Sequence, residues 1–372
     1  MARTVASGYD VVTVTGDPEE RGYQYGLAAR TRIELALRTY ADVFMHYASW
    51  DWATVRRHGL RFADPIEDFS PASAREIRGI ARGAGVEVAD ILALNTRSEI
   101  MFAAPGRLRA VAASECTSFA LTPERTASGV PLMGQNWDWI EGARETAVVL
   151  QVRRDDGPDF VTVVEAGMLA KVGINSSGVG LCTNTLISDG DEGRPGVPYH
   201  VLLRSVLDSD SGAEAAARIK STSRANSANY LIADASGFCM DVETGPGDGA
   251  CGEITPVDGA ITHANHFLVG GLTGVDRYLE RKAHTRKRLH HLTARLQQHR
   301  THTIESLQEA LADHADAPDS VCQHPDVAQP TAERTCTVAG IIMDLSDRSL
   351  MYASGSPCES TWSLPVRIDA SS

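Results

Sequence analysis

Two stretches, Ser114-Glu115-Cys116-Thr117-Ser118-Phe119 and Gly134-Gln135-Asn136-Trp137-Asp138-Trp139, decide how this chain is interpreted. The character of the sequence changes at Cys116. Helix signals precede it, whereas short apolar runs separated by Gly, Asn, Asp and Ser follow it at hairpin spacing, which predicts antiparallel strands. Each stretch alone has an ordinary explanation, because most isolated cysteines are inert core residues and the second stretch could be a turn with two core tryptophans.

Residues 1–115 are expected to be mostly helical. Asp17-Pro18-Glu19-Glu20 begins a helix, because the aspartate can cap it and proline suits its first position, and this helix should run to about Tyr47. Ser70-Pro71 begins another helix in the same way. Residues 76–95 then predict two helices separated by a glycine-rich break.

After Cys116 the chain is expected to consist mainly of strands, with helices between them. Helix, then strands, then helix, then strands indicates two sheets packed together and covered by helices, an α+β fold. In this region we expect helices at residues 198–207, 213–220, 274–300 and 304–312, and the last strands at residues 335–344 and 349–353.

The composition fits a globular protein and excludes some classes of partner. With 372 residues the chain can form one large domain or two tightly joined ones. A formal net charge of -13 argues against a nucleic-acid or anionic-membrane partner. No run of about 18 apolar residues occurs, so we expect no transmembrane helix.

The cysteines and histidines give no pattern of a known metal site. Seven cysteines, an odd number, and a beginning without an apolar signal segment predict reduced thiols and a cytoplasmic location. The absence of a Cys-x-x-Cys pair argues against structural zinc, and no metal is expected. His263 and His266 lie close in sequence, but no nearby Cys or carboxylate completes a ligand set. Cys322-x-His324 with Cys336 lacks the spacing of papain-like proteases.

Taken together, the two stretches resemble the acyl-coenzyme A:isopenicillin N acyltransferase family, which belongs to the self-processing N-terminal-nucleophile hydrolases. The resemblance extends along most of the chain in the same order. The further matching segments are residues 76–95, 165–167, 171–179, 196–198, 262–266 and 320–325.

The resemblance implies a four-layer αββα sandwich with a mostly helical N-terminal segment. It also implies autocatalytic cleavage between Glu115 and Cys116, so that residues 1–115 form a helical chain that stays bound and residues 116–372 form the catalytic domain. The thiol of Cys116 would attack the preceding carbonyl and later the acyl carbon of the substrate. A thiol with a pKa of about 8.5 needs a base at neutral pH, and the new α-amine, with a reference pKa of about 7.7–8.0, would supply it.

The resemblance implies roles for three more residues. Asn265 would donate a side-chain hydrogen bond to the oxyanion, although it could also belong to a capped turn. Asp138 would orient the α-amine of Cys116 and hold its charge, although it could also be a turn or cap residue. Ser118 would form a hydrogen bond near the nucleophile.

Two positions depart from the family pattern. Glu115 stands where fungal members carry glycine, and its carboxylate could slow the cleavage or assist it as a base. Gln323 stands where many members carry arginine, and an amide cannot replace a guanidinium that pairs with Asp138 or with a substrate carboxylate. Either the substrate lacks that charge, or another cation, Arg334, substitutes. Trp137, Gln323 and Arg334 are therefore the candidate substrate-binding residues.

Residues 284–300 are basic and helix-prone. This pattern favours a solvated helix face, with docking of a phosphate-bearing acyl carrier such as coenzyme A as the alternative. No cofactor is expected, although a coenzyme A thioester could be the acyl donor.

The expected function is amide-bond chemistry through an acyl-Cys116 thioester, in an autoprocessed acyltransferase acting on a small amine or amino-acid-like metabolite. An amide hydrolase is the alternative, because water can accept the acyl group at the same site. A noncatalytic binding protein that keeps the fold is a further alternative. The expected partners are a small-molecule acyl donor, an amine acceptor and the cleaved N-terminal chain, in an αβ heterodimer.

Overall fold

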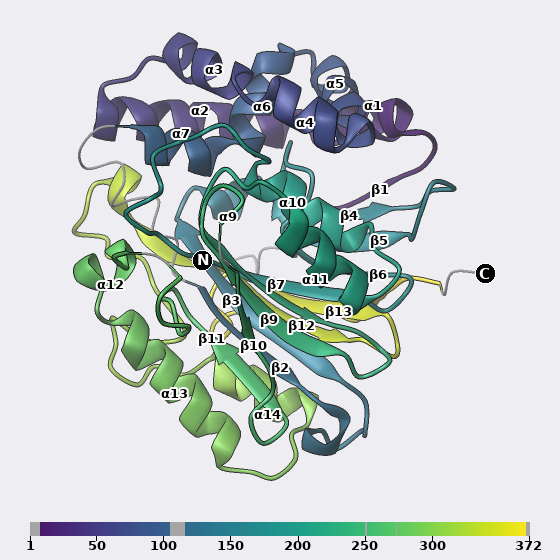
Figure 1. The fold of residues 1–372 in the computed structure, drawn as a ribbon, viewed down its shortest axis with the longest axis vertical. Coiled ribbons are helices and arrows are strands. Elements are labelled where there is room, and N and C mark those ends of the chain that lie inside the picture. Colours follow the sequence, from purple (N-terminus) through teal and green to yellow (C-terminus); the bar gives the residue numbers. More distant parts are fainter. Residues whose placement is uncertain (1–7, 105–115, 250, 273, 370–372) are drawn as a thin grey trace, which may run out of the picture.

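Two β-sheets lie face to face in the computed structural model, which describes residues 8–104, 116–249, 251–272 and 274–369 (Figure 1). Neighbouring strands are antiparallel except β1 and β4, which are parallel. The first sheet has eight strands in the order β1 (Val11–Val14), β4 (Ala147–Val152), β5 (Phe160–Glu165), β6 (Val172–Asn175), β7 (Gly180–Thr185), β8 (Ala228–Ala233), β9 (Cys239–Thr244) and β10 (Cys251–Ile254). The second has six, in the order β11 (Ala260–His263), β2 (Cys116–Leu121), β3 (Leu132–Ile140), β12 (Thr335–Asp344), β13 (Ser349–Ser354) and β14 (Val366–Arg367).

Helices cover the outer faces of both sheets, which completes the αββα sandwich implied by the resemblance. On the eight-stranded sheet, α10 (Tyr199–Leu207) and α11 (Gly212–Ser221) contact β6, β7, β8 and β9. On the six-stranded sheet, α13 (Thr285–Gln297) contacts β2 and β11, and α14 (Ile304–Leu311) contacts β12. Every residue of β2 and β3 is buried, because one face packs on the other sheet and the opposite face is covered.

The N-terminal helices gather at one end of the molecule (Figure 1). They are α1 (Pro18–Ala28), α2 (Arg30–Ala48), α3 (Trp52–Leu60), α4 (Ala63–Phe69), α5 (Pro71–Ala84), α6 (Val88–Asn95) and α7 (Arg97–Ala103). The expected caps are confirmed: Asp17 accepts from the main-chain nitrogens of Glu19 and Glu20, and Ser70 accepts from that of Ser73. Shorter helices elsewhere are α9 (Ala143–Thr146), α12 (Arg277–Arg281) and two 3-10 turns, η1 (Pro123–Arg125) and η2 (Thr331–Glu333).

Glycines allow α1 and α5 to pack with their backbones in contact. A Cβ atom at Gly22 would lie 2.2 Å from the carbonyl oxygen of Glu76, and one at Gly79 would lie 2.2 Å from that of Glu19. Neither position can hold a larger residue without separating the helices. The close approach fixes the N-terminal helices as a rigid layer.

Two expectations about the elements are wrong, and one strand was not foreseen. The helix expected to continue to Tyr47 is interrupted at Ala29, where the chain turns from the α5 contact toward α9. Residues 11–14, which read Val-Val-Thr-Val, form strand β1 within the mostly helical N-terminal part; two valines alternate inward, as on a half-buried strand. Residues 274–300 form two helices, α12 and α13, rather than one.

The helices expected at residues 198–207, 213–220 and 304–312 and the strands expected at residues 335–344 and 349–353 are confirmed within a residue or two. Among the described residues, the helices are too short or too polar to cross a bilayer.

Candidate active site

Cys116 is the first residue of β2 and is buried, with 1% of its surface exposed. It pairs with Trp137 on β3, so both side chains lie on the same face of the sheet. The Cys116 sulfur lies 4.0 Å from the carbonyl oxygen of Asp138. The antiparallel pairing of β2 and β3 therefore brings together the two stretches singled out in the sequence. Glu115 lies outside the described residues.

Asn265 contacts the main chain of Cys116 through its side-chain oxygen. The nitrogen of Cys116 donates to Oδ1 of Asn265 at 2.7 Å, and Nη2 of Arg288 donates to the same oxygen at 3.0 Å. Two donors facing one atom identify that atom as the oxygen. The amide nitrogen of Asn265 donates to the carbonyl of Thr185 at 3.0 Å. Because an amide nitrogen carries two hydrogens, a second donor remains for an oxyanion.

Arg288 is a site residue that the sequence interpretation missed. Its side chain is fully buried, and Nη1 donates to the carbonyl oxygen of Cys116 and to Oγ1 of Thr117, both at 2.8 Å. The guanidinium therefore holds both the main chain of Cys116 and the side chain of Asn265. The expectation of a solvated face holds for exposed Arg286 and is wrong for Arg288.

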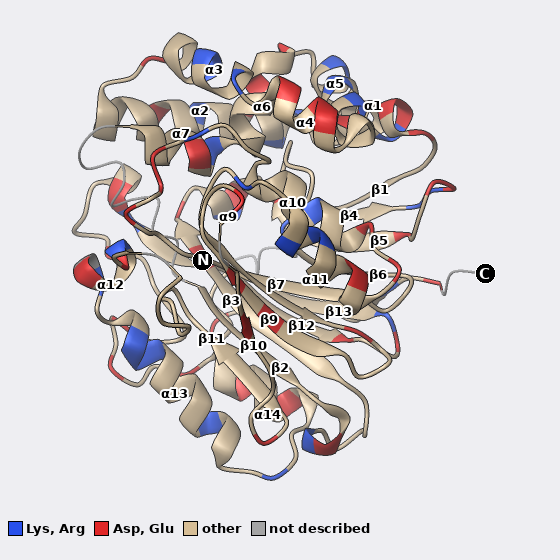
Figure 2. Cartoon of the chain, viewed as in Figure 1, with Lys and Arg blue, Asp and Glu red and all other residues tan. Residues whose placement is uncertain are grey.

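A sequence signal for Arg288 did exist. Basic residues lie along α13 in Figure 2, but the buried positions of this helix, Thr285, Arg288, Leu292 and Leu296, follow a spacing of three and four residues. Arg288 thus occupies a core-facing position of an amphipathic helix. An arginine at such a position needs acceptors in the interior, and here the acceptors belong to the active site.

A buried carboxylate shapes the loop that carries Asn265. Glu243 on β9 accepts from the nitrogens of Leu268 and Val269 at 2.7 and 2.9 Å, and it lies 2.7 Å from Nε2 of His263. Although burial opposes the charge, nearby carboxylates including Glu243 raise the pKa of His263. Residues on both sides of Asn265 are therefore tied to one strand of the opposite sheet.

Asp138 is connected to Gln323 through one hydroxyl. Thr337 donates from Oγ1 to Oδ1 of Asp138 at 2.6 Å and accepts from the main-chain nitrogen of Gln323 at 2.9 Å. The Gln323 segment thus lies beside Asp138. Arg334 is directed elsewhere, toward Glu141 at 3.4 Å and the carbonyls of Gln329 and Val327.

Ser118 lies on the same face of β2 as Cys116, two residues along the strand. Its hydroxyl donates to Oδ1 of Asn184 on β7 at 2.7 Å, and Asn229 on β8 donates to the same oxygen at 3.0 Å. Ser118 therefore joins the two sheets two residues along the strand from Cys116.

Lys171 is a second residue that was not singled out as part of the site. It is buried, and its ammonium lies 5.0 Å from the ring centre of Trp137 and 5.8 Å from that of Tyr199. Burial lowers its pKa to about 8, while the nearby Cys116 acts in the opposite direction. One feature of the sequence could have pointed to this residue: Lys171 is a single lysine between the apolar runs around β6.

An αββα sandwich with a buried cysteine at the start of a central strand is the architecture of the N-terminal-nucleophile hydrolases. The sequence profile described as acyl-coenzyme A:6-aminopenicillanic acid acyl-transferase matches residues 125–359. The acyl-coenzyme A:6-aminopenicillanic-acid-acyltransferase 40 kDa form of Emericella nidulans is 32% identical over 260 residues, which is 69% of each chain. The chain belongs to this acyltransferase family and is an enzyme.

Solved structures with a similar arrangement include a variant of conjugated bile acid hydrolase from Clostridium perfringens. It has a TM-score of 0.45 and 13% identity, and the match covers 68% of this chain and 98% of that one. Penicillin V acylase from Agrobacterium tumefaciens has a TM-score of 0.39 and 15% identity, with 64% and 83% covered. Asp138, Asn265 and Gln323 lie inside the range matched by the family profile, whereas Cys116 and Ser118 precede it.

Proposed function

We propose that this protein is an acyltransferase that cuts its own chain before Cys116 and carries the acyl group as a thioester on the Cys116 sulfur. One observation carries the proposal. The nitrogen of Cys116, which would become the α-amine, already lies 2.7 Å from Oδ1 of Asn265, while Arg288 holds the carbonyl of the same residue. The future base and the thiol thus have fixed positions before any cleavage.

The proposed processing step moves an acyl group from nitrogen to sulfur. The Cys116 sulfur attacks the carbonyl carbon of Glu115, the carbon–nitrogen bond breaks, and the nitrogen takes up the thiol proton. Water hydrolyses the resulting thioester, which leaves a carboxylate on Glu115 and a free α-amine on Cys116. The freed thiol can then react with a substrate.

In turnover, the α-amine of Cys116 takes the thiol proton and the thiolate attacks the acyl carbon of the donor. The second N–H of the Asn265 amide is the proposed oxyanion donor. The intermediate collapses, the leaving group departs with a proton, and the acyl group remains on sulfur. An amine acceptor then attacks the thioester and regenerates the thiol. The nearby ammonium of Lys171 favours the thiolate form of Cys116.

The N-terminal chain is proposed to stay bound after cleavage, as an αβ heterodimer. Arg97 on α7 pairs with Glu165 on β5 at 2.8 Å, and both side chains are almost fully buried. Glu76 on α5 pairs with Arg204 on α10 at 2.9 Å, again in the interior. Separating the chains would leave these charges unpaired, and breaking a buried pair costs about 3–5 kcal/mol.

The proposed substrates are small molecules, an acyl-coenzyme A donor and an amine or amino-acid-like acceptor, by analogy with the name of the Emericella relative. Because Gln323 is neutral and Arg334 is engaged with Glu141, we expect an acceptor without a negative group beside Asp138. A cytoplasmic location belongs to the same proposal and rests on the seven cysteines, all within the described residues and none in a disulfide.

Intact-mass measurement tests both parts of the proposal. Fresh protein should give two chains, residues 1–115 and 116–372. Incubation with a panel of acyl-coenzyme A thioesters should then add one acyl mass to the chain that begins at Cys116, and an amine acceptor should remove it. Discharge by water alone would make the protein a hydrolase, and a chain that is neither cut nor acylated would contradict the proposal.

A further inference from the structure

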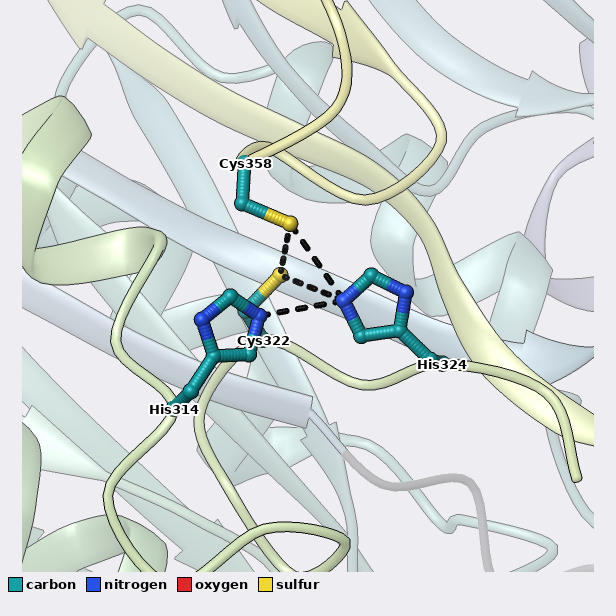
Figure 3. A group of neighbouring side chains, drawn as sticks. All are labelled: His314, Cys322, His324 and Cys358. Carbon is teal, nitrogen blue, oxygen red and sulfur yellow. Dashed lines mark hydrogen bonds between the residues drawn. The ribbon is translucent and has the colours of Figure 1, made fainter.

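Four side chains of types that can bind a metal converge beside strand β12 of the six-stranded sheet (Figure 3). They are His314, Cys322, His324 and Cys358, and their ligand atoms all lie within 4.8 Å of one another. His314 follows α14, Cys322 and His324 lie in the segment before β12, and Cys358 follows β13. The pairing of β12 with β13 returns the chain toward Cys358, and the hydrogen bonds of Gln323 with Thr337 and Ser356 hold the Cys322 segment beside it.

Four of the six distances between the ligand atoms lie close to the edges of a metal tetrahedron. With zinc–sulfur bonds of about 2.3 Å and zinc–nitrogen bonds of about 2.0–2.1 Å, the edges should be about 3.8 Å between two sulfurs, about 3.6 Å between sulfur and nitrogen, and about 3.3 Å between two nitrogens. The two sulfurs are 3.6 Å apart and the two Nε2 atoms 3.0 Å. His324 Nε2 lies 3.3 Å from the sulfur of Cys358 and 3.9 Å from that of Cys322.

Other pairings explain only part of this arrangement. A disulfide between Cys322 and Cys358 needs sulfurs about 2.05 Å apart and gives no reason for two imidazoles to face them. A hydrogen bond between His314 and His324 does not explain why the two thiols lie beside the imidazoles. One cation accounts for all four ligand atoms at once.

We propose that His314, Cys322, His324 and Cys358 bind one zinc ion in a closed, structural Cys₂His₂ site. Binding releases the two thiol protons to solvent, and the two thiolates balance the charge of the cation while both imidazoles stay neutral. Glu359 lies 3.6 Å from Nδ1 of His324, on the far side of the ring from the metal position, where a carboxylate orients a ligating imidazole.

The ion would fix the wall of the active site beside Asp138. Gln323 lies between two of the ligands, its nitrogen donates to Thr337, and Thr337 donates to Asp138. The carbonyl of Gln323 accepts from Ser356, two residues before the ligand Cys358, at 2.8 Å. A cavity of about 610 Å³, lined in part by Gln323 and His324, adjoins this segment. The four ligands would therefore act on the active site by holding the Gln323 segment in position. The proposed zinc site itself does not depend on the proposed acyl chemistry.

Metal content tests the site without any measurement of activity. The full chain, purified under reducing conditions and analysed by native mass spectrometry and elemental analysis, should hold one zinc ion. Replacement by Co²⁺ should give a tetrahedral spectrum with thiolate-to-cobalt charge-transfer absorption. Cys358→Ser and His314→Ala remove exposed ligands and should each lower zinc affinity by about 100-fold or more in chelator competition.

Matched controls replace a cysteine and a histidine outside the group. Cys251→Ser and exposed His290→Ala should keep one zinc ion. Removing zinc should lower the melting temperature of the wild type and of both control variants, and adding zinc back should restore it. The melting temperature of the ligand variants should not respond to the addition of zinc. A wild-type chain without zinc or cobalt binding overturns the proposal. So does a Cys322–Cys358 disulfide in the protein as purified under reducing conditions, before any zinc is removed, or equal zinc affinity in ligand and control variants.

Discussion

The nitrogen of Cys116 lies 2.7 Å from Oδ1 of Asn265, so the asparagine contacts the main chain of Cys116 through its acceptor. In the uncut chain this bond holds a peptide nitrogen. After cleavage the same oxygen would accept a hydrogen bond from the α-amine of Cys116. The lone pair of the amine nitrogen would then be directed toward the thiol. Asn265 would then have two tasks, holding the base and donating to the oxyanion.

Asn265→Ala should reduce kcat by roughly 10²–10³, because loss of an oxyanion donor raises the barrier without weakening substrate binding. Steady-state kinetics on cut protein measures this, with processing scored separately by gel. A fully cut variant with unchanged kcat would remove Asn265 from the site.

Cys116→Ala should abolish both processing and turnover, because one sulfur serves both steps. Cys239→Ala is the matched control, since the Cys239 thiol lies on β9 in the other sheet. This variant should keep both processing and turnover. Intact mass and product formation report the two steps. Normal activity in Cys116→Ala would contradict the mechanism as a whole.

Arg288→Lys should lose most activity, because a single ammonium cannot bond the carbonyl of Cys116 and Oδ1 of Asn265 as the guanidinium does. We expect a loss of about 10²-fold in kcat/KM, similar to that for a misplaced catalytic group. Arg286→Lys, two residues earlier on the exposed face of α13, is the control and should be silent. Equal activity of the two variants would mean that Arg288 serves folding alone.

Asp138→Asn tests the partner of the α-amine through pH. A nearby negative charge raises the pKa of an amine, so its removal should lower that pKa and move the acidic limb of kcat/KM to lower pH. The profile must be measured on cut enzyme, because the uncut chain has no amine to titrate. A cut, folded variant with an unmoved acidic limb would exclude Asp138 from this role.

The parts of the fold predicted from sequence are those with local causes. Asp17 and Ser70 cap helices through bonds to their own next turn, and strands β12 and β13 follow from their short apolar runs. The break at Ala29 has no local cause, because it results from the different packing partners of α1 and α2.

The parts of the site that sequence did not reveal depend on contacts distant along the chain. Arg288 lies 172 residues from Cys116, and its basic neighbours hid its core-facing position. Cys322 and Cys358 lie 36 residues apart, which no short metal-binding spacing includes. The β12–β13 hairpin and the contacts of Gln323 with Thr337 and Ser356 bring them together. The search for local pairs therefore missed a group of ligands that the sheet assembles.

Lys171→Met should stabilise the protein at neutral pH while reducing its activity. The pKa of Lys171 is lowered to about 8 from 10.5, chiefly by burial, so the folded state releases this proton more easily than the unfolded state does. Stability should therefore rise as pH increases from about 8 to 10.5. At pH 7 Lys171 is protonated in both the folded and the unfolded state, and burying its charge lowers the free energy of unfolding by about 3 kcal/mol. Contacts of the ammonium with the Trp137 and Tyr199 rings offset about 2 kcal/mol of this.

Methionine fills a similar space without the charge, so Lys171→Met should gain about 1–3 kcal/mol at pH 7, and the gain should shrink toward pH 10.5. The same change removes a positive charge that interacts with Cys116 and should slow turnover. Denaturant midpoints at pH 7 and pH 10, compared in the same processing state, measure the first effect. Lys220→Met, which removes a surface ion pair with Glu253, is the control and should show little dependence on pH. If Lys171→Met were less stable than wild type at pH 7, the ammonium would be a net structural support, and its retention beside the nucleophile would need no catalytic explanation.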